Sequence, residues 1–341
     1  MKILVIRLSA MGDVAMSVPV FKTLSEQHSD NDFYLITNKL FNPFFSDIRN
    51  LTLINPDLKG KHKSIKGLFQ LYKKIKKEIN PDIVIDIHDV LRTKIIRFFF
   101  RLSGIKSVKI NKGRKEKRQL TRRKNKIFKP LKHTVTRYKE AFLKAGVSIK
   151  LHPYSVPEFK IDSFELKKLL QSNDKKIGIA PFAKHPQKQY PIKKTEALIQ
   201  KLTDENYKIF LFGGGKKEKY IAENIAEKNP DVTSLVGKFP LEEEIAFIDQ
   251  LDVMITPDSG NMHIAALTSV KIISIWGATH PFAGFTPYIP DEQFHIIQNN
   301  NLSCRPCSVF GNKPCYKNTI ECLQLIDNED IIKFCKRIIE L

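Results

Sequence analysis

The residues best suited to chemistry lie in one short segment, Asp258-Ser-Gly-Asn-Met-His263. An apolar, β-rich run precedes this segment, a helical pattern begins within it, and a second apolar, β-rich run follows the helix. This order predicts a βαβ unit with a polar loop after the first strand. Ligands of α/β folds bind at that edge of the sheet. Ser259 and Gly260 would begin the helix, where backbone N–H groups favour a phosphate. Asp258 and His263 would flank the ligand, unless they serve only as a helix cap and a buried structural histidine.

A second candidate lies near the N-terminus. A buried strand over residues 3–6 is followed by Gly12, which permits a tight turn, and by a helix from about Val14. Asp13 would lie at this turn, where its carboxylate could accept a proton from a hydroxyl substrate. The alternative is that Asp13 is simply the N-cap of the helix. No G-x-G-x-x-G pattern occurs here, so the turn does not indicate a dinucleotide site.

Three loops in the second half follow predicted strands and contain groups that suit a diphosphate. They are residues 181–191 with Lys188, Gly213-Gly-Gly215 before a helix that contains Glu218, and Asp258-Ser-Gly260. A diphosphate needs a cation, backbone donors and glycine clearance together. We therefore expect a diphosphate site where these loops converge, although each loop alone could be ordinary turn chemistry with a surface lysine.

The elements that must position these groups alternate along the chain. In the first half we expect strands at 33–36, 51–54, 83–87 and 108–110, and helices at 65–79, 91–102 and about 136–145. A second alternation begins at residue 176. This pattern predicts an α/β protein with doubly wound parallel sheets. The expected domains are an N-terminal Rossmann-like domain over 1–150, a connection over 151–175, a C-terminal Rossmann-like domain over 176–325 and a final helix over 326–341.

Length and hydropathy narrow the class of protein. The 341 residues, 42% of them hydrophobic, suffice for two domains with real cores. No apolar run reaches about 18 residues, so no spanning helix is expected. Arg7, Asp13 and Pro19 interrupt the first apolar stretch, which excludes a signal peptide. We therefore expect a cytoplasmic protein.

Positive charge is concentrated in the first half. Residues 1–150 hold 34 Lys and Arg against 12 Asp and Glu, whereas residues 151–341 hold 23 against 24. This asymmetry indicates an anionic partner for the N-terminal half. Aromatic residues are too sparse in the basic region for the stacking platform of a single-strand nucleic-acid binder. A nucleic-acid-binding protein remains the alternative from another functional class.

Within this half, residues 112–137 are the most basic stretch, with 12 Lys and Arg and one acidic residue. They lack hydrophobic periodicity, so we expect a loop or mobile arm. Arg118, Arg122 and Arg123 in this arm could capture phosphates or carboxylates, unless the arm is a solvated loop with no fixed partner. His88, at the end of a predicted strand, is a further candidate ligand contact or a structural histidine.

Taken together, these motifs resemble glycosyltransferase family 9, typified by the ADP-heptose:lipopolysaccharide heptosyltransferases, over nearly the whole chain. The matching segments are Ile6-Arg-Leu-Ser-Ala-Met-Gly-Asp13, Lys188-Gln-Tyr-Pro191, Asp258-Ser-Gly-Asn-Met-His263 and Gly277-Ala-Thr279. The resemblance implies the GT-B architecture, in which two Rossmann-like domains face each other across a cleft. It also implies an anionic lipid-linked glycan as acceptor on the N-terminal side and a nucleotide sugar, with ADP-heptose favoured, on the C-terminal side.

Carried over by residue, the resemblance makes Asp13 the general base of an inverting transfer. Lys188 would neutralise the diphosphate, Ser259 and Gly260 would donate backbone N–H groups, and Asp258 and His263 would contact the sugar or phosphates. Glu218 is the best match to an acidic residue near the ribose. Gly12, His88 and the three arginines of the arm would contact the acceptor. The resemblance requires no cofactor or divalent metal, and it places the enzyme at the cytoplasmic surface of the inner membrane.

The chain also departs from the family pattern. Tyr190 stands where Trp is usual, Phe182-Ala183 replaces a Gly-Ala type pair, and Lys216 and Lys217 precede Glu218. These differences leave the donor nucleotide open. A nucleotide-sugar epimerase of the same architecture is the nearer alternative; it would act on the donor without an acceptor.

Four cysteines form a further cluster in the sequence. Cys304, Cys307, Cys315 and Cys322 lie within 19 residues, a spacing that could bind zinc in a closed tetrahedral site. The alternative is a set of reduced thiols without a ligand, because disulfides are rare in the cytoplasm.

Overall fold

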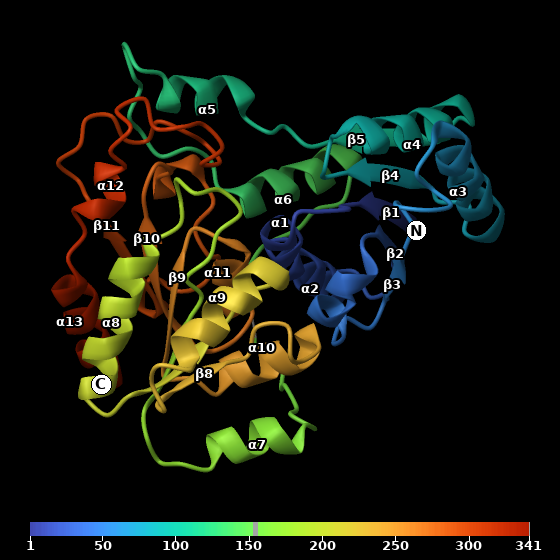
Figure 1. The fold of residues 1–341 in the computed structure, drawn as a ribbon. Helices are drawn as coiled ribbons and strands as arrows, with labels where there is room; N and C mark the ends of the chain where they lie inside the picture. Colours follow the sequence, from blue (N-terminus) through green and yellow to red (C-terminus); the bar gives the residue numbers. More distant parts are fainter. Residues whose placement is uncertain (153–155, 341) are drawn as a thin grey trace. The chain divides into compact units, whose positions relative to one another are not determined.

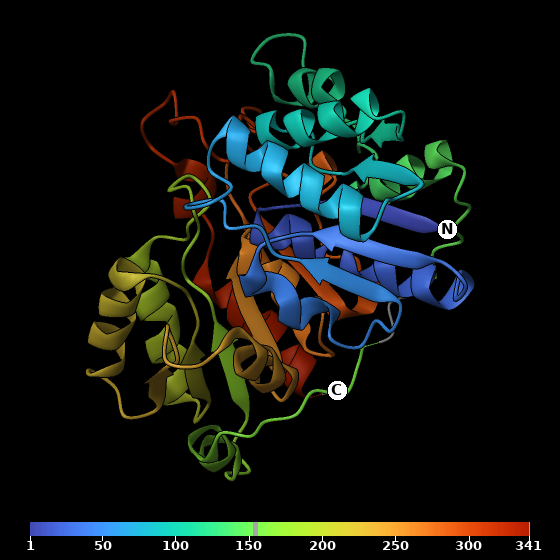
Figure 2. The same cartoon turned by 90° about the vertical axis from the view of Figure 1, so that its right-hand side faces the viewer.

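The computed structural model describes residues 1–152 and 156–340, and the chain divides into two compact units. The first unit comprises Met1–Gly113 together with Lys132–Tyr154, and the second comprises Arg114–Leu131 together with Ser155–Leu341. Figures 1 and 2 show a parallel sheet with flanking helices in each unit. The predicted α/β class with two parallel sheets is therefore confirmed.

The first unit is built on a five-stranded parallel sheet in the order β3-β2-β1-β4-β5. Its strands are β1 (Lys2–Ile6), β2 (Asp32–Ile36), β3 (Leu51–Ile54), β4 (Ile83–Asp86) and β5 (Lys106–Lys109). The central strand β1 is fully buried from Ile3 to Ile6, because helices cover both faces of a sheet of this kind. Polar groups that act on a ligand must therefore come from the ends of these strands.

One face of β1 packs against α3 (Ile65–Glu78) and α4 (Leu91–Leu102). Leu4 and Ile6 belong to a core cluster with buried residues of these two helices, which Figure 1 shows side by side. The remaining helices of the unit are α1 (Met11–Ala15), α2 (Val18–Gln27) and α6 (Thr134–Ala145), with a 3-10 segment η1 (Lys39–Phe45). Phe21 of α2 meets Phe142 of α6 edge to face, with ring centroids 6.2 Å apart.

The second unit is built on a six-stranded parallel sheet in the order β11-β10-β9-β6-β7-β8. Its strands are β6 (Lys176–Ile179), β7 (Lys208–Leu211), β8 (Val232–Ser234), β9 (Val253–Pro257), β10 (Lys271–Trp276) and β11 (Phe294–Gln298). Its main helices are α7 (Phe164–Leu170), α8 (Ile192–Asp204), α9 (Lys216–Ala226), α10 (Leu241–Asp249), α11 (Gly260–Ala265), α12 (Glu321–Gln324) and α13 (Asn328–Ile339). The loops predicted to bind a diphosphate follow β6, β7 and β9, which are neighbours in this sheet, so their convergence at one edge is explained by the strand order.

The basic stretch differs from its prediction in two respects. It contains a helix, α5 (Arg114–Thr121), where we expected a loop, because Leu120 and Thr121 are buried and hold the end of the helix. The arm is also attached to the second unit. The Lys126 ammonium donates to the carbonyl oxygens of Ser303, Cys304 and Arg305 at 2.8–3.2 Å, and the Leu131 N–H donates to the Phe282 carbonyl.

No helix in the described ranges, residues 1–152 and 156–340, has the length and apolarity needed to cross a membrane.

Tyr190, which departs from the family pattern, is a core residue of the second unit. Its ring is 2% exposed, and its hydroxyl donates to Asn328 Oδ1 at 2.7 Å. Asn328 begins α13, and its amide nitrogen donates to the Lys194 carbonyl of α8. Tyr190 therefore connects the loop after β6 to the C-terminal helix.

We predict that Tyr190→Phe lowers the free energy of unfolding by about 1–2 kcal/mol, because the buried Asn328 oxygen loses its donor. Urea unfolding followed by circular dichroism measures the change. Tyr220→Phe is a matched control, since that side chain is 67% exposed and the change there should stay within about 0.5 kcal/mol. Equal unfolding midpoints for Tyr190→Phe and Tyr220→Phe would contradict this role.

Candidate active site

The carboxyl end of β1 carries an ion pair between Arg7 and Asp13. Arg7 follows the strand directly, and its guanidinium Nη2 lies 2.5 Å from Asp13 Oδ2. Nη1 of the same guanidinium donates to the Ile87 carbonyl, after β4, at 2.8 Å. Arg7 is 5% exposed whereas the Asp13 side chain is 35% exposed. The carboxylate is thus held from one side by a buried cation and can still be reached by a hydroxyl group.

Asp13 lies in the first turn of α1, which begins at Met11 after the N-cap Ala10. If Asp13 were the N-cap, the helix would begin at residue 14, but it begins at Met11. The alternative that Asp13 is the N-cap is therefore wrong. The Asp13 carbonyl accepts a hydrogen bond from the buried Tyr138 hydroxyl at 3.0 Å. Both the side chain and the backbone of Asp13 are thus fixed by residues outside the helix.

His88 lies next to this ion pair in the first unit. Its Nδ1 accepts a hydrogen bond from the Leu8 backbone N–H at 3.3 Å, which places the neutral ring's proton on Nε2. Burial, together with the nearby positive charges of Arg7 and Lys112, lowers the pKa of His88 to about 3. The imidazole is therefore neutral at physiological pH and supports the turn between β1 and α1.

The turn after β4 is organised by Asp86. Its Oδ1 accepts hydrogen bonds from the backbone N–H groups of His88 and Asp89 at 3.0 and 2.7 Å. Its Oδ2 lies 3.3 Å from Nη1 of Arg97 in α4. A buried carboxylate with these donors holds the loop that presents His88 to Leu8.

In the second unit, Lys188 and Asp258 form the corresponding ion pair. Lys188 Nζ lies 3.0 Å from Asp258 Oδ2, and the side chains are 15% and 6% exposed. The Lys188 stem packs on Gly311, where an added Cβ would come within 2.4 Å of Lys188 Cγ. The cation predicted for the diphosphate is therefore held at the end of β9, beside the segment that contains Asp258.

The segment after β9 forms the expected strand-to-helix turn. Ser259 is the N-cap of α11, and its hydroxyl lies 3.1 Å from the Thr256 hydroxyl. Gly260 is the first residue of the helix, and His263 is buried within it. Asp258, Ser259 and Gly260 thus lie in sequence at one edge of the sheet, as their pattern predicted.

The glycine loop after β7 is closed by Glu218. The Gly214 N–H donates to Glu218 Oε2 at 2.8 Å, and Gly215 is the N-cap of α9 with a φ of +86° that favours glycine. An added Cβ at Gly213 would lie 2.7 Å from the Phe182 ring. Phe182, which departs from the family pattern, therefore packs directly on this loop.

The predicted acceptor residues fall in different units. Gly12, Asp13 and His88 lie together in the first unit. Arg118, Arg122 and Arg123 are exposed residues of the arm and belong to the second unit. The Arg123 guanidinium lies 4.2 Å from the centroid of the Tyr316 ring. The sequence predictions missed Arg7, although an arginine directly after a buried strand is the kind of signal that could have indicated it.

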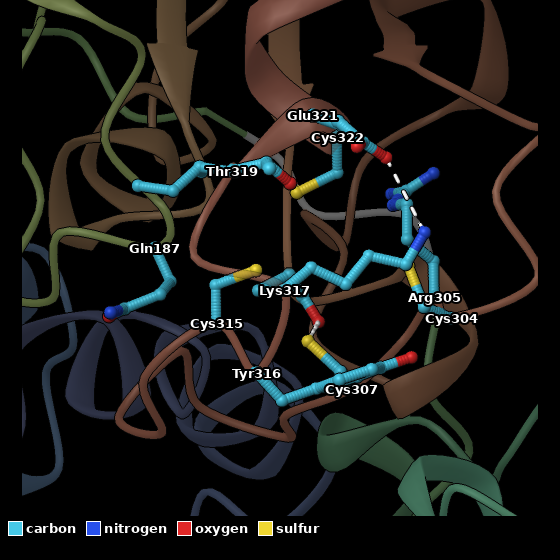
Figure 3. Close-up of a pocket in the computed structure, with 12 residues that line it drawn as sticks. Gln187, Cys304, Arg305, Cys307, Cys315, Tyr316, Lys317, Thr319, Glu321 and Cys322 are labelled. Atoms are coloured by element: carbon cyan, nitrogen blue, oxygen red, sulfur yellow. Dashed lines mark hydrogen bonds and ion pairs between the residues drawn. The ribbon is translucent and has the colours of Figure 1, made fainter.

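The four cysteines of the predicted zinc site line one pocket, together with Arg305 and Lys317, as Figure 3 shows. Arg305 is 5% exposed and donates only to oxygens of neighbouring residues, among them the Gly277 and Trp276 carbonyls at 2.6 and 3.0 Å. Burial raises the pKa of Cys322 to about 11. Among the described residues, no three Cys, His, Asp or Glu side chains form a group that could hold a metal ion. Zinc at these thiols stays a prediction.

Comparison with known proteins places this geometry in context. The model of glycosyltransferase family 9 (heptosyltransferase) matches residues 68–315. Lipopolysaccharide heptosyltransferase 1 of Campylobacter coli is 26% identical over 99% of each chain. Lipooligosaccharide heptosyltransferase 2 of Campylobacter jejuni is 26% identical over 100% of this chain and 99% of that relative. The resemblance inferred from the motifs is confirmed.

Two solved structures share the fold. A glycosyl transferase family 9 protein from Veillonella parvula has a TM-score of 0.75 at 20% identity, covering 99% of this chain and 97% of that one. E. coli heptosyltransferase WaaC with ADP has a TM-score of 0.66 at 19% identity, covering 99% and 100%. Both match the two-sheet α/β architecture along its full length, so the fold class predicted from the resemblance, GT-B, is confirmed.

We predict that His88 makes the protein less stable as the pH falls from about 6.5 toward 3. The unfolded chain binds a proton in this window, but the folded state does not until the pKa of about 3 is reached. His88→Asn keeps an acceptor for the Leu8 N–H and cannot titrate. Melting temperatures measured from pH 8 to pH 4 should fall less steeply for the variant. Identical slopes would show that His88 is not held neutral.

Proposed function

Since this chain belongs to glycosyltransferase family 9, the heptosyltransferases, we propose that it transfers a heptose from ADP-heptose to an anionic lipid-linked glycan of the lipopolysaccharide core. It is a glycosyltransferase by membership of that family. The observation that supports the reaction is the presence of two carboxylate–cation pairs at strand ends, Arg7–Asp13 in one unit and Lys188–Asp258 in the other. The printed names of the relatives, which are lipopolysaccharide and lipooligosaccharide heptosyltransferases, support the substrate class.

Asp13 acts as the general base in this proposal. Its partly exposed carboxylate takes the proton of the acceptor hydroxyl as the hydroxyl oxygen attacks the anomeric carbon of the donor. The bond from that carbon to the diphosphate oxygen breaks, and the sugar changes its anomeric configuration. Arg7 holds the carboxylate in position by its bonds to Asp13 and to the carbonyl of Ile87.

The donor is bound by the second unit. Lys188 neutralises the departing diphosphate, and backbone N–H groups at Ser259 and Gly260 donate to it. Asp258 positions the Lys188 ammonium in the free protein and contacts the sugar or phosphates with His263 when the donor is bound. Glu218, which already closes the glycine loop, lies beside the ribose. The reaction needs no divalent metal, because Lys188 and the backbone donors supply the positive charge.

The acceptor is anionic, which agrees with the basic composition of residues 1–150. Gly12 and His88 lie beside Asp13 and contact the acceptor sugar. Arg118, Arg122 and Arg123 of the arm bind its phosphates. A lipid-linked acceptor places the working enzyme in the cytoplasm at the surface of the inner membrane.

We predict that Asp13→Asn lowers the rate of transfer by about 10²–10⁴-fold, because the variant has no base. Transfer is measured by chromatography of an acceptor oligosaccharide incubated with ADP-heptose. The ADP-induced shift of the melting temperature should stay close to that of the wild type, since Asp13 lies outside the donor unit. Asp47→Asn, a change of another ion-paired aspartate in the first unit, is the control. Retention of more than about a tenth of the wild-type rate excludes Asp13 as the base.

We predict that Lys188→Ala weakens ADP binding by about ten- to a hundredfold, since a hydrogen bond to a charged group contributes about 1.5–3 kcal/mol. Thermal shifts with ADP, UDP, GDP and CDP measure the affinity and identify the donor nucleotide. Lys193→Ala, a change of an exposed lysine in the first turn of α8, is the control. The double variant Lys188→Ala/Asp258→Asn separates loss of the cation from repulsion by the unpaired carboxylate. Unchanged ADP affinity in Lys188→Ala would remove this residue from the diphosphate site.

A further inference from the structure

Helix α4 has two apolar faces, of which only one is used by the core. Thr93, Ile96 and Phe100 are buried, and Ile96 and Phe100 belong to the core cluster that includes residues of the first unit's sheet and α3. On the opposite side, Leu91, Phe98 and Leu102 recur at helical spacing and are 74%, 54% and 71% exposed. A helix that only covered a sheet would carry polar residues there. The second apolar face therefore needs an explanation beyond folding.

Helix α3 extends this apolar surface. Its Ile65 and Phe69 are 64% and 37% exposed. The Phe69 ring meets the Phe99 ring of α4 at a centroid distance of 5.0 Å, and Phe99 in turn lies 6.0 Å from Phe98. Figures 1 and 2 both show the two helices side by side. We name the exposed apolar residues of these two adjacent helices, Ile65, Phe69, Leu91, Phe98 and Leu102, the α3–α4 face.

The charge around the α3–α4 face is almost entirely positive. The two helices together contain nine Lys and Arg and one acidic residue, Glu78. Helical spacing places Lys94 and Arg101 along one side of the exposed stripe of α4 and Arg92 along the other. The Lys73 ammonium lies 4.8 Å from the centroid of the Phe69 ring. Apolar side chains at the centre are thus bordered by cations on long stems.

We propose that the α3–α4 face docks the protein on the surface of an anionic lipid bilayer. Leu and Phe side chains would enter the boundary between headgroups and acyl chains, while the surrounding Lys and Arg contact lipid phosphates. A second copy of the chain is a poorer occupant, because it would bring the cations that border this face, Lys73, Arg92, Lys94 and Arg101, against the same four. Anionic lipid satisfies both the apolar and the charged part of the surface.

This inference rests on the proposed function, because a lipid-linked acceptor gives the enzyme a reason to bind a membrane. It assigns the membrane contact to particular residues, none of which takes part in the proposed chemistry. Vesicle binding is therefore measured without donor or acceptor. Transfer to a water-soluble acceptor oligosaccharide tests the chemistry separately.

The first experiment measures binding of the protein to vesicles by co-sedimentation. The vesicles contain either phosphatidylcholine alone or equal parts of phosphatidylcholine and phosphatidylglycerol. Wild-type protein should bind the anionic vesicles and bind the neutral ones much more weakly. Phe98→Ser/Leu102→Gln should lose about tenfold or more in affinity for the anionic vesicles, because two apolar side chains no longer enter the lipid. Phe164→Ser/Leu325→Gln is the matched control, since these residues of the second unit are 80% and 60% exposed, and its affinity should be unchanged.

The second experiment tests whether the positive side chains beside the exposed stripe of α4 contribute to vesicle binding. Lys94→Gln/Arg101→Gln should lose about tenfold or more in affinity for anionic vesicles at low salt, and the difference from wild type should shrink as salt is added. The ADP-induced thermal shift of each variant should match that of the wild type. A matching shift shows that the chain is folded, so that lost vesicle binding is not due to unfolding.

Three results would overturn the proposal. The wild type could fail to bind anionic vesicles, or either double variant of α4 could bind them as well as the wild type does. Alternatively, sedimentation in solution could show a wild-type dimer that Phe98→Ser/Leu102→Gln converts to a monomer, which would assign the face to a second copy. Loss of vesicle binding with normal transfer to a soluble acceptor supports docking, and normal binding without any transfer counts against the proposed function alone.

Discussion

A parallel strand that is covered by helices on both faces can carry functional polar groups only at its ends, and both units depend on this constraint. β1 is buried from Ile3 to Ile6, and the first charged residue after it, Arg7, already takes part in the Asp13 ion pair. β9 is buried throughout, and Asp258 follows it directly. Because parallel strands point the same way, the ends of neighbouring strands contribute to the same site.

The two ion pairs use the same arrangement with opposite roles. In the first unit the cation Arg7 is the more buried partner and leaves the carboxylate of Asp13 accessible, as a base requires. In the second unit the carboxylate of Asp258 is the more buried partner, and Lys188 is the group nearer to solvent, as an anion-binding residue requires. Burial of the supporting partner is costly unless it is paired, so removal of either accessible partner would leave an uncompensated buried charge. This difference in burial supports the proposed roles of Asp13 in proton transfer and of Lys188 in phosphate binding.

The sequence predicted the regular elements closely because their signals are local. β3 and α4 have the predicted boundaries, and α3 and α6 differ by only one or two residues at an end. The start of α1 was placed too late, since residues 11–13 carry no apolar periodicity and their helix is held instead by Arg7 and Tyr138. Helix α5 was missed for a similar reason. Its sequence is almost entirely polar, and the chain that follows it is held by hydrogen bonds from Lys126 to the carbonyl groups of residues 303–305.

The sequence by itself determined the α/β class, the strand-end positions of Asp13 and Asp258, and the positive charge of the first half, because periodicity, turn residues and charge are properties of short segments. Only the tertiary structure decided which residues these functional side chains pair with. It paired Asp13 with Arg7 and Lys188 with Asp258, turned Glu218 onto its own glycine loop, and attached the basic arm to the second unit. Pairings of this kind depend on strand order and on which side chains are buried together. Both arise from contacts between residues far apart in the chain, as for Lys188 and Asp258. Arg7–Asp13 and Gly214–Glu218 are close in the chain, but spacing alone does not say which polar neighbour each side chain meets.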